Sequence, residues 1–546
     1  MTDVIIAGGG PAGLVTAIEL GRRGVRCVLF EEDADAPSFP KANATTSRTM
    51  EHYRRLGLAR EIRALGLPLD YPQDVTYFTR FSQYELARLP GLTRREAMAL
   101  REGPRSRWPT PEPLHRVQQM YIEAVLRREA ARHPSATLEL GWRVTQAAQD
   151  DAQVTVEATE IASGKIQRIE AKYVVGCEGA KSLVREMLGV KYGGVANEDR
   201  EFLGGRMLST YLHAPAIYDV MRAPKSWQYW ATNRERRATM AAIDGEGLFV
   251  AQLQLAPGAG GSAKFATGCL TQAMGCEFPH RIIAVEEWKA GFTLVAERFG
   301  GGRAFLAGDA AHLFTPTGGQ GYNTSVDDAA NLGWKLAAVC RGWADSRLLA
   351  SYEAERQPIA RRNTGFARAM ADSIGRMTIP MELEDATSEG AAARTTLGKQ
   401  LYHHSWTEFD IPGIHFGMFY GASPVIAGDG SPPPPDQWDA YTPTATPGAR
   451  APHVWLNADT ALFDRFGRDF TLLRLGSGRS IDTDSIEVVA AKRGMPLAVV
   501  DIDSAEARDV YDCDLVLIRP DQHVAWRGNA VPGDAQALLA RVTGGR

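Results

Sequence analysis

The chain has 546 residues and a formal net charge of −4 at pH 7, with 44% apolar and 23% charged residues. These values are typical of a protein of two or three domains with ample core, and they exclude the basic surface that nucleic-acid-binding proteins need. No stretch approaches the apolar run that crosses a bilayer, and Met1 leads into a strand without a signal-peptide pattern. We therefore expect a cytoplasmic protein without a nucleic-acid or membrane partner.

The cysteines do not point to a metal or disulfide framework. Six of them are scattered along the chain, and no pair has CxxC spacing. Such spacing fits neither a zinc site nor a disulfide-stabilised scaffold, so we expect no metal and interpret these residues as small buried side chains.

The first thirty residues predict a dinucleotide-binding site. After a short apolar strand, Gly8, Gly10 and Gly13 stand in GxGxxG register before a helical segment. Gly8 permits a tight turn, Gly10 lets the backbone approach a pyrophosphate, and Gly13 lets the helix pack closely on the strand. A second apolar run ends at Glu31, where an acid accepts hydrogen bonds from a ribose. The motif alone does not choose between FAD and NAD.

The chain up to residue 256 alternates between patterned and irregular segments. A helix is predicted from 47 to 56 and another over 116–131, whereas 68–113 is rich in Pro and Arg and is predicted to be irregular. Strands are expected at 154–157, 166–170 and 173–177. Further β-like runs between 203 and 256 predict a mixed sheet inserted between the nucleotide-binding pieces.

The second half of the chain returns to the nucleotide-binding pattern and then changes character. A buried strand is predicted at 303–307, followed by helices over 323–341 and from 344 to beyond 362. The segment from 373 to 447 has little pattern and contains a short proline run, which is typical of a stiff connector. The expected division of this α/β chain is 1–180 and 286–372 for nucleotide binding, 181–285 for substrate, 373–447 as connector and 448–546 as a small terminal domain.

Two further motifs follow the first one in order. Residues 173–185 read YVVGCEGAKSLVR, in which a strand delivers Gly179 to a turn that precedes a helix. Residues 305–335 begin FLAGDAAHLFTPTGGQGYN, and a helix that starts within this glycine-rich run directs its positive dipole at whatever lies before it.

Together these motifs resemble those of the class A flavoprotein monooxygenases, and most closely the branch of phenol and 2,4-dichlorophenol hydroxylases. Gly308-Asp309 resembles the GD motif, whose Asp accepts a hydrogen bond from the FAD ribityl chain, and 316–323 matches the PxGGQGxN segment near the flavin ring. Glu178 stands where the family's DG motif usually has Asp. The run PGARAPH at 447–453 resembles the start of that branch's C-terminal domain.

The resemblance implies a Rossmann-like FAD-binding domain of the glutathione-reductase type, an inserted mixed β-sheet substrate domain and a thioredoxin-like C-terminal domain without CxxC. Redox activity is not expected in the last domain. The residues expected to contact the cofactor are Gly8, Gly10, Pro11, Ala12, Gly13, Glu31, Glu32, Arg48, Gln119, Glu178, Gly179, Arg185, Gly308, Asp309, Pro316, Gly319, Gly321, Tyr322 and Asn323.

The resemblance also implies an activity. Members bind FAD, take a hydride from NADH or NADPH and use O2, through a flavin C4a-hydroperoxide, to hydroxylate a substituted phenol or catechol in aromatic catabolism; a nitro or chloro substituent is compatible with this. An alternative is a tailoring hydroxylase of a polycyclic polyketide, or an antibiotic-modifying monooxygenase. A third is an FAD oxidase or reductase. The family's frequent dimers also allow a homodimer.

The substrate side has few candidates. Asn43 occupies a position where relatives place Asp or His near the phenolic oxygen, and Asn can hydrogen-bond a substrate but cannot act as a base. Tyr229 lies in the strand block expected to cover the pocket, although alternate aromatics on a strand more often fill a core. His213 is a weaker alternative. Three basic residues could meet an anionic group, although such residues usually lie on the surface: Lys41, Arg206 and Arg222.

Overall fold

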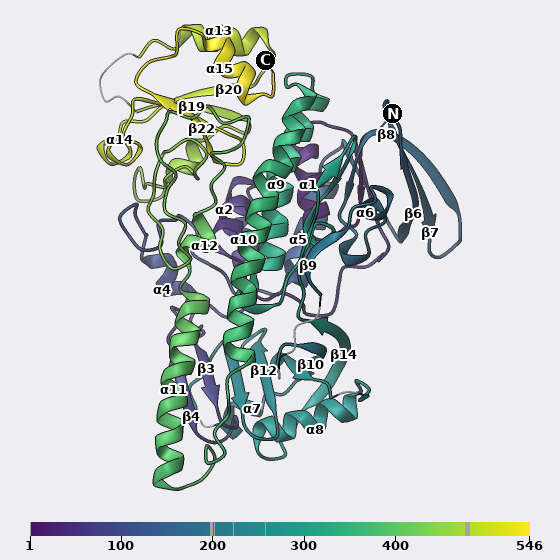
Figure 1. Cartoon of the computed structure of the whole chain (residues 1–546), viewed down its shortest axis with the longest axis vertical. Coiled ribbons are helices and arrows are strands. Elements are labelled where there is room, and N and C mark those ends of the chain that lie inside the picture. The colour runs from purple at the N-terminus through teal and green to yellow at the C-terminus, as the bar shows by residue number, and fades with distance from the viewer. Residues whose placement is uncertain are drawn as a thin grey trace.

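The computed structural model places three sheet-containing parts around two long helices (Figure 1). The nucleotide-binding sheet lies on one side of helix α9, the second sheet lies below it, and the C-terminal sheet lies at the top. The residues that the structure describes are 2–196, 200, 202–221, 223–256, 258–475 and 481–545. Arg222, one of the basic candidates, lies outside them.

The first sheet has the order β16-β17-β8-β1-β2-β5, with the β6–β7 hairpin continuing from β8. Its central strands are parallel and almost wholly apolar, because helices cover both faces of such a sheet. The two strands expected between 166 and 177 are one continuous strand. The bounds are β1 Thr2–Ala7, β2 Cys27–Glu31, β5 Ala136–Leu140, β6 Trp142–Gln149, β7 Val154–Glu160, β8 Ile166–Gly176, β16 Gly300–Gly301 and β17 Ala304–Leu306.

The second sheet is the inserted mixed sheet and has the order β14-β10-β13-β12-β11-β3-β4. Its last two strands come from the segment 68–113, so the prediction of irregular structure there is wrong. Strand β3 is held by parallel pairing with β11, in which Val75 is opposite Gln228. The bounds are β3 Val75–Phe78, β4 Glu85–Leu89, β10 Gly205–His213, β11 Gln228–Thr232, β12 Arg237–Ala242, β13 Leu248–Gln254 and β14 Arg281–Ala290, with α4 Arg94–Ala99 following β4.

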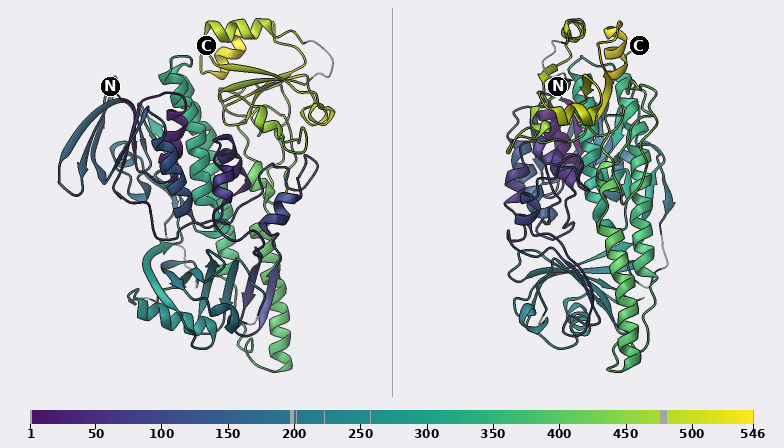
Figure 2. Two further views of the ribbon diagram at one scale, coloured as in Figure 1. Left: turned by 180° about the vertical axis from the view of Figure 1, so that it is seen from behind. Right: turned by 90° about the vertical axis from the view of Figure 1, so that its left-hand side faces the viewer.

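Long helices join the two sheets. Helix α9 (Gln320–Cys340) packs against α1 (Pro11–Gly21), while α10 (Ala350–Gly375) and α11 (Ser388–Phe409) run from the nucleotide-binding part to the second sheet (Figure 2). The segment 373–447 therefore holds a long helix rather than connector alone. This helix packs closely on β4, since a Cβ at Gly398 would lie 2.2 Å from the Leu86 carbonyl oxygen.

The remaining elements of the nucleotide-binding part confirm the predicted helices near residues 47 and 116. Their bounds, with those of the short elements used below, are α2 Ser47–Arg55, α3 Ala59–Arg63, α5 Gln119–Ala131, α6 Leu183–Met187, β9 Tyr192–Val195, β15 Thr293–Ala296 and β18 His312–Leu313. The short α7 Ile217–Met221 and α8 Ala263–Met274 flank the second sheet.

The C-terminal domain is a thioredoxin-like four-stranded sheet of order β20-β19-β21-β22. Its helices pack on a separate apolar core that also contacts Trp334 of α9. Cys513 is buried in a second apolar cluster of this domain, and burial raises the pKa of its thiol to about 11. The bounds are β19 Phe470–Arg474, β20 Leu497–Asp501, β21 Leu515–Ile518, β22 Val524–Gly528, α13 Asp484–Lys492, α14 Ala505–Tyr511 and α15 Ala535–Val542.

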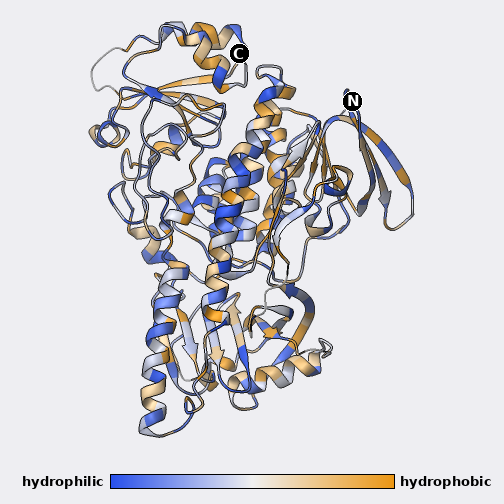
Figure 3. Ribbon diagram, viewed as in Figure 1, coloured by the Kyte–Doolittle hydropathy of each residue, from blue (hydrophilic) through white to orange (hydrophobic). Residues whose placement is uncertain are grey.

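Hydropathy alternates along the long helices of the molecule, which carry both polar and apolar residues (Figure 3). Within the described part of the chain, none of the helices combines the length and the apolar character that a membrane crossing requires.

Buried charges attach the C-terminal domain to the body of the protein. Glu355 of α10 accepts hydrogen bonds from both Nη atoms of Arg519, at 2.7 and 2.8 Å, and from Nζ of Lys335 at 2.6 Å. Arg48 of α2 donates to the Gln522 side chain at 2.8 Å and to the Asp521 carbonyl at 2.6 Å. The expected contact of Arg48 with the cofactor is therefore corrected: it joins α2 to the C-terminal domain.

The buried ion pairs of Glu355 with Arg519 and of Glu51 with Arg450 predict that the protein is sensitive to acid. Burial alone would raise the pKa of Glu355 and of Glu51, but the neighbouring Arg519 and Arg450 outweigh it and lower both from 4.5 to about 2. A carboxyl whose pKa is lower when folded contributes stability above its unfolded pKa and loses it as the pH falls. We expect the free energy of unfolding, measured by urea titration, to fall between pH 4.5 and 2. An unchanged free energy over that range would contradict this.

Candidate active site

The turn after β1 has the geometry that a dinucleotide loop requires. Gly8 has φ +98°, and a Cβ there would lie 2.3 Å from the Cys177 carbonyl oxygen. A Cβ at Gly13 would lie 2.0 Å from the Gly8 carbonyl, so helix and strand are in backbone contact. Nothing lies within 4 Å of a Cβ placed at Gly10. The loop is therefore closed beneath Gly8 and Gly13 and open at Gly10, as the motif predicts.

The second glycine-rich run begins helix α9 and borders a cavity that also reaches the loop after β1. Gly318 and Gly319 have φ of +67° and +63°, which residues with side chains rarely adopt. Asn323 accepts a hydrogen bond from the Thr46 amide at 2.8 Å and donates to the Ala44 carbonyl at 2.9 Å, so it ties α9 to the segment that precedes α2. The first-turn amides of α9 present positive partial charge to the cavity.

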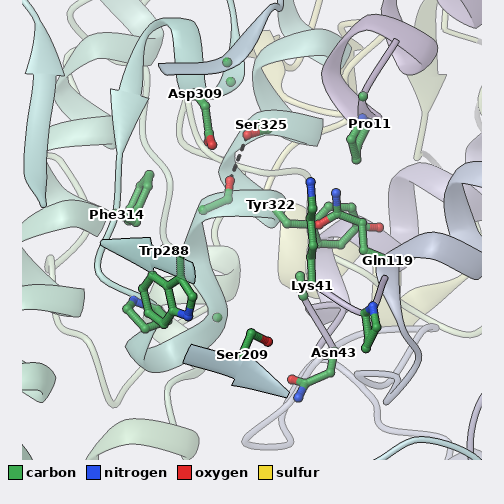
Figure 4. Close-up of a pocket in the computed structure, with 18 of the residues that line it drawn as sticks. Pro11, Lys41, Asn43, Gln119, Ser209, Trp288, Asp309, Phe314, Tyr322 and Ser325 are labelled. Carbon is green, nitrogen blue, oxygen red and sulfur yellow. Dashed lines mark hydrogen bonds between the residues drawn. The ribbon is translucent and has the colours of Figure 1, made fainter. Parts of the chain in front are cut away.

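Both glycine-rich runs border one cavity of about 760 Å³, a size usual for ligand sites. Figure 4 shows Pro11 and Asp309 at one end, Trp288, Ser209 and Asn43 at the other, and Lys41 and Tyr322 between them. The cavity thus continues from the nucleotide loop to the second sheet. The predicted cofactor residues that line it are Gly10, Pro11, Ala12, Glu31, Glu32, Gln119, Gly179, Gly308, Asp309, Pro316, Gly319, Gly321 and Tyr322.

Other predicted cofactor residues support the cavity from behind. Gly8 and Gly13 shape the loop, and Asn323 fixes α9, as described above. The Glu178 carboxylate accepts hydrogen bonds from Ser182 Oγ at 2.7 Å and from the Val184 amide at 3.1 Å, so it stabilises the start of α6. Arg185 stacks on the Tyr192 ring and donates to its hydroxyl at 2.8 Å. The structure does not bring the side chains of Glu178 and Arg185 to the cavity.

Two carboxylates face the nucleotide end of the cavity. Glu31 accepts hydrogen bonds from the Gly9 amide at 2.5 Å and the Asp33 amide at 2.9 Å, which orient it without using all its lone pairs. Asp309 lies exposed to the cavity, and no described residue donates to its carboxylate. Although the carboxyl is open to the cavity, the protein around the cavity keeps it from bulk water and so raises its pKa. Both groups can therefore accept hydrogen bonds from hydroxyls of a ligand.

A buried histidine holds the loop that carries Asp309. His312 Nε2 lies 2.6 Å from Oδ2 of Asp328, and Arg356 donates to the other oxygen of that carboxylate at 2.8 Å. His312 therefore positions the loop and does not reach the cavity.

One face of the second sheet forms the other half of the cavity. Trp288 Nε1 donates to Gln252 Oε1 at 2.9 Å, and Gln252 Nε2 donates to Ser209 Oγ at 3.0 Å, which leaves the serine proton free for another acceptor. Gln228 Oε1 and Trp230 Nε1 are buried at this face without a partner among the described residues. Unpaired buried polar atoms at a cavity indicate a polar ligand.

The structure separates the sequence candidates for the substrate side. Asn43 and Lys41 line the cavity. Tyr229 points to the opposite face of β11, where it is 1% exposed and accepts a hydrogen bond from the Ser226 amide at 2.7 Å. His213 is exposed at the end of β10, and Arg206 pairs with Glu287 on the surface. Tyr229 and His213 are thus not placed to act on a ligand in this cavity.

Sequence reasoning missed most of the sheet residues. The alternation of strand side chains places Gln228 and Trp230, not Tyr229, at the cavity, and a sequence does not show which of its two faces a strand turns inward. Ser209, Gln252 and Trp288 carried no motif, and only their shared face identifies them.

Family comparisons decide the identity of this site. A family model described as an FAD binding domain matches residues 1–367, and one described as the C-terminal domain of aromatic-ring hydroxylases matches residues 444–545. The chain belongs to the FAD-dependent aromatic-ring hydroxylases. It is therefore an FAD-dependent monooxygenase that uses NAD(P)H as co-substrate, as the sequence motifs predicted.

Similar proteins cover this hydroxylase from end to end. The FAD-dependent monooxygenase apdD of Emericella nidulans is 31% identical over 99% of this chain and 90% of its own length. The 2,4-dichlorophenol 6-monooxygenase of Cupriavidus pinatubonensis is 27% identical over 98% and 95%. The structure of the rebeccamycin biosynthetic enzyme RebC with reduced flavin superimposes with a TM-score of 0.88 at 31% identity and covers 100% of this chain and 99% of that one.

The residues present fit FAD. The open backbone at Gly10 and the start of α1 would receive the diphosphate, and Glu31 the ribose. Asp309 would accept from a hydroxyl of the ribityl chain, and the amides at the start of α9 would face the flavin ring. Bound FAD supplies the electron transfer and the oxygen chemistry, while the protein supplies its position and the surrounding charge.

Replacement of Asp309 tests its expected contact with FAD. Because this carboxylate has room around it and no described donor, Asp309→Ala should keep the fold but weaken FAD retention by about 10-fold or more, the usual effect of losing a hydrogen bond to a charged group. The flavin absorbance retained after gel filtration measures this. An equally yellow and equally active variant would rule out the assignment.

Proposed function

We propose that this hydroxylase acts on a multi-ring aromatic substrate that carries phenolic or similar oxygens. The observation that supports the proposal is the width of the substrate half of the cavity, which is lined by five adjacent strands, β14, β10, β13, β12 and β11. Neighbouring strands lie about 4.8 Å apart, so four spacings span about 19 Å. That is more than a single phenol ring occupies, and it suits several fused rings lying flat on the sheet.

The side chains on this face divide into flat apolar and polar groups. Trp230, Trp288 and Phe292 offer aromatic surface, on which ring systems stack. Asn43, Ser209 and Gln228 offer hydrogen bonds for ring oxygens, and none of these is a strong base. Their contribution is to orient the attacked carbon and to exclude water, rather than to remove a proton.

The proposed reaction balances as one ring C–H, O2, NAD(P)H and one proton giving C–OH, H2O and NAD(P)+. One oxygen atom enters the substrate, and the other leaves as water with the two electrons from NAD(P)H. The similarity to RebC, a rebeccamycin biosynthetic enzyme, supports a tailoring role over aromatic catabolism.

The proposal is tested by comparing substrates with one aromatic ring and substrates with several. The yellow enzyme should be assayed for NAD(P)H oxidation, hydrogen peroxide and product with phenol, a dichlorophenol and a nitrocatechol, and with a naphthol, an anthrol and a hydroxyanthraquinone. We expect strong stimulation with little peroxide only in the multi-ring set. Ala241→Phe, which narrows the middle of the sheet face, should reduce that stimulation and leave FAD binding unchanged.

A monocyclic phenol or catechol is the second candidate, because the similarity to the dichlorophenol monooxygenase extends over 98% of the chain. Coupled turnover of the single-ring compounds, unaffected by Ala241→Phe, would favour this candidate and contradict the proposal. Stimulation that appears wholly as peroxide would indicate an oxidase reaction.

A further inference from the structure

A second, smaller cavity of about 70 Å³ adjoins the first where the glycine-rich run before α9 meets the second sheet. Both cavities are bordered by Asn43, Gln228, Pro316, Gly319 and Glu408, so the smaller one is a side pocket of the substrate region. Its other walls come from separate parts of the chain, and they include Arg116, Trp227, Phe409 and His415.

Arg116 is the unusual residue of this side pocket. Its guanidinium carbon lies 3.5 Å from the centre of the Trp227 ring and 5.6 Å from that of Phe409. A guanidinium stacked in this way uses its flat face and keeps its N–H edge free for acceptors in its own plane. Within the described part of the chain, no side chain or carbonyl accepts a hydrogen bond from it, and its Nε is buried without a partner. Most of the buried arginines among the described residues have a carboxylate partner, for example Arg450 with Glu51.

The neighbouring titratable groups do not satisfy this edge. Glu408 is the nearby acid, but no hydrogen bond or ion pair joins it to Arg116: its Oε1 accepts from the Gly318 amide at 2.8 Å, and its Oε2, although 3.0 Å from His404 Nε2, is buried without a hydrogen-bond partner among the described residues. His415 accepts from the Ser47 amide at 3.2 Å, and burial lowers the pKa of its ring to about 3, so it is neutral. Burial also lowers the pKa of Arg116 to about 9, which still leaves the side chain charged at neutral pH.

We propose that Arg116 binds a carboxylate of the substrate and so determines both the choice of substrate and its orientation. The planar N–H edge matches the two oxygens of a carboxylate, whereas a phenolate offers one. An acid group held beside Pro316 and Gly319 would leave the attached rings extending over the sheet from Gln228, whose buried Oε1 lacks a partner, towards Trp288. This inference rests on the proposed multi-ring substrate and adds an acidic substituent to it.

Binding tests the proposal without turnover. The FAD-loaded enzyme should be titrated with hydroxynaphthoic acids and with the matching hydroxynaphthamides, followed by the change in flavin absorbance. The natural enzyme should bind the acids more tightly than the amides. Arg116→Met should weaken acid binding by about 10- to 100-fold, the range for hydrogen bonds to a charged group, and change amide binding by less than about 3-fold. Arg206→Met is the control, because it removes an equal charge outside the cavity; it should change neither.

Several results would overturn the proposal. These are equal affinity of the natural enzyme for acids and amides, absence of acid binding, or an equal loss of acid and amide binding in Arg116→Met. If Arg116→Met does not retain FAD, Arg116→Lys decides: it keeps the charge but loses the planar edge, and it should weaken the acids selectively. Selective acid binding without hydroxylated product would count against the proposed function alone, since this readout needs no reaction.

Discussion

Gly10→Val is expected to give a folded protein that is purified without FAD. Gly10 has φ −71° and ψ −176°, which valine adopts readily, and a Cβ there meets nothing within 4 Å. The side chain would therefore clash only with a diphosphate brought close to the backbone. Affinity for FAD should fall by about 100-fold or more, as the loss of one or two hydrogen bonds to a charged phosphate gives. Flavin fluorescence on titration with FAD measures it.

Gly13→Ala is the matched control for this loop. Its Cβ would lie 2.0 Å from the Gly8 carbonyl, so the backbone itself must move and the protein should be poorly folded. Circular dichroism and thermal unfolding distinguish the two variants. If Gly10→Val is isolated as yellow as the natural enzyme, the diphosphate does not lie at Gly10.

Glu355→Gln should destabilise the protein by about 3–5 kcal/mol, because it removes one charge from a buried cluster, which leaves Lys335 without its acid partner and Arg519 with Asp521 alone. Glu355 accepts from Arg519 and Lys335, and also from Asn331 at 2.7 Å and Ser423 at 2.6 Å. Since Arg519 belongs to the C-terminal domain, hydrogen exchange should accelerate first in β21 and β22. Urea titration gives the free energy of unfolding.

An exposed pair provides the comparison for Glu355. Arg95 and Asp70 lie 2.5 Å apart with side chains 60% and 66% exposed, so Arg95→Gln should change stability little. Equal effects of the two substitutions would mean that the buried cluster does not hold the C-terminal domain in place.

Local motifs made the cofactor half of this protein predictable. The GxGxxG run, Gly308-Asp309 and the 316–323 segment each depend on backbone conformations within a few residues, and each lines or closes the cavity as expected. Helices near 47, 116 and 323 were also predicted, and the one near 116 follows from its apolar spacing.

Contacts between residues far apart in the sequence explain the features that sequence reasoning did not predict. Strand β3 forms because 75–78 pairs with 228–231, and Arg48 meets Asp521 and Gln522 far along the chain. No local pattern contains such partners. Helix α11 was not predicted either. Its aromatic residues Tyr402 and Trp406 are about two-fifths exposed, so its apolar residues do not follow the regular spacing of one buried face.

Substrate residues were the least predictable, for a related reason. Tyr229 and its neighbour Gln228 differ only in the face of β11 that they occupy, and that face is fixed by the whole sheet. Arg116 is recognisable only when its surroundings show that its stacked guanidinium has no acceptor.

Isotope incorporation tests the central claim most directly. Turnover of an accepted multi-ring substrate under ¹⁸O2 with NAD(P)H should give a product with one added oxygen atom, labelled as ¹⁸O, and about one product for each NAD(P)H consumed. A product without the label, or peroxide equal to the NAD(P)H oxidised, would contradict the conclusion that this cavity places an aromatic carbon for oxygen transfer from the flavin site.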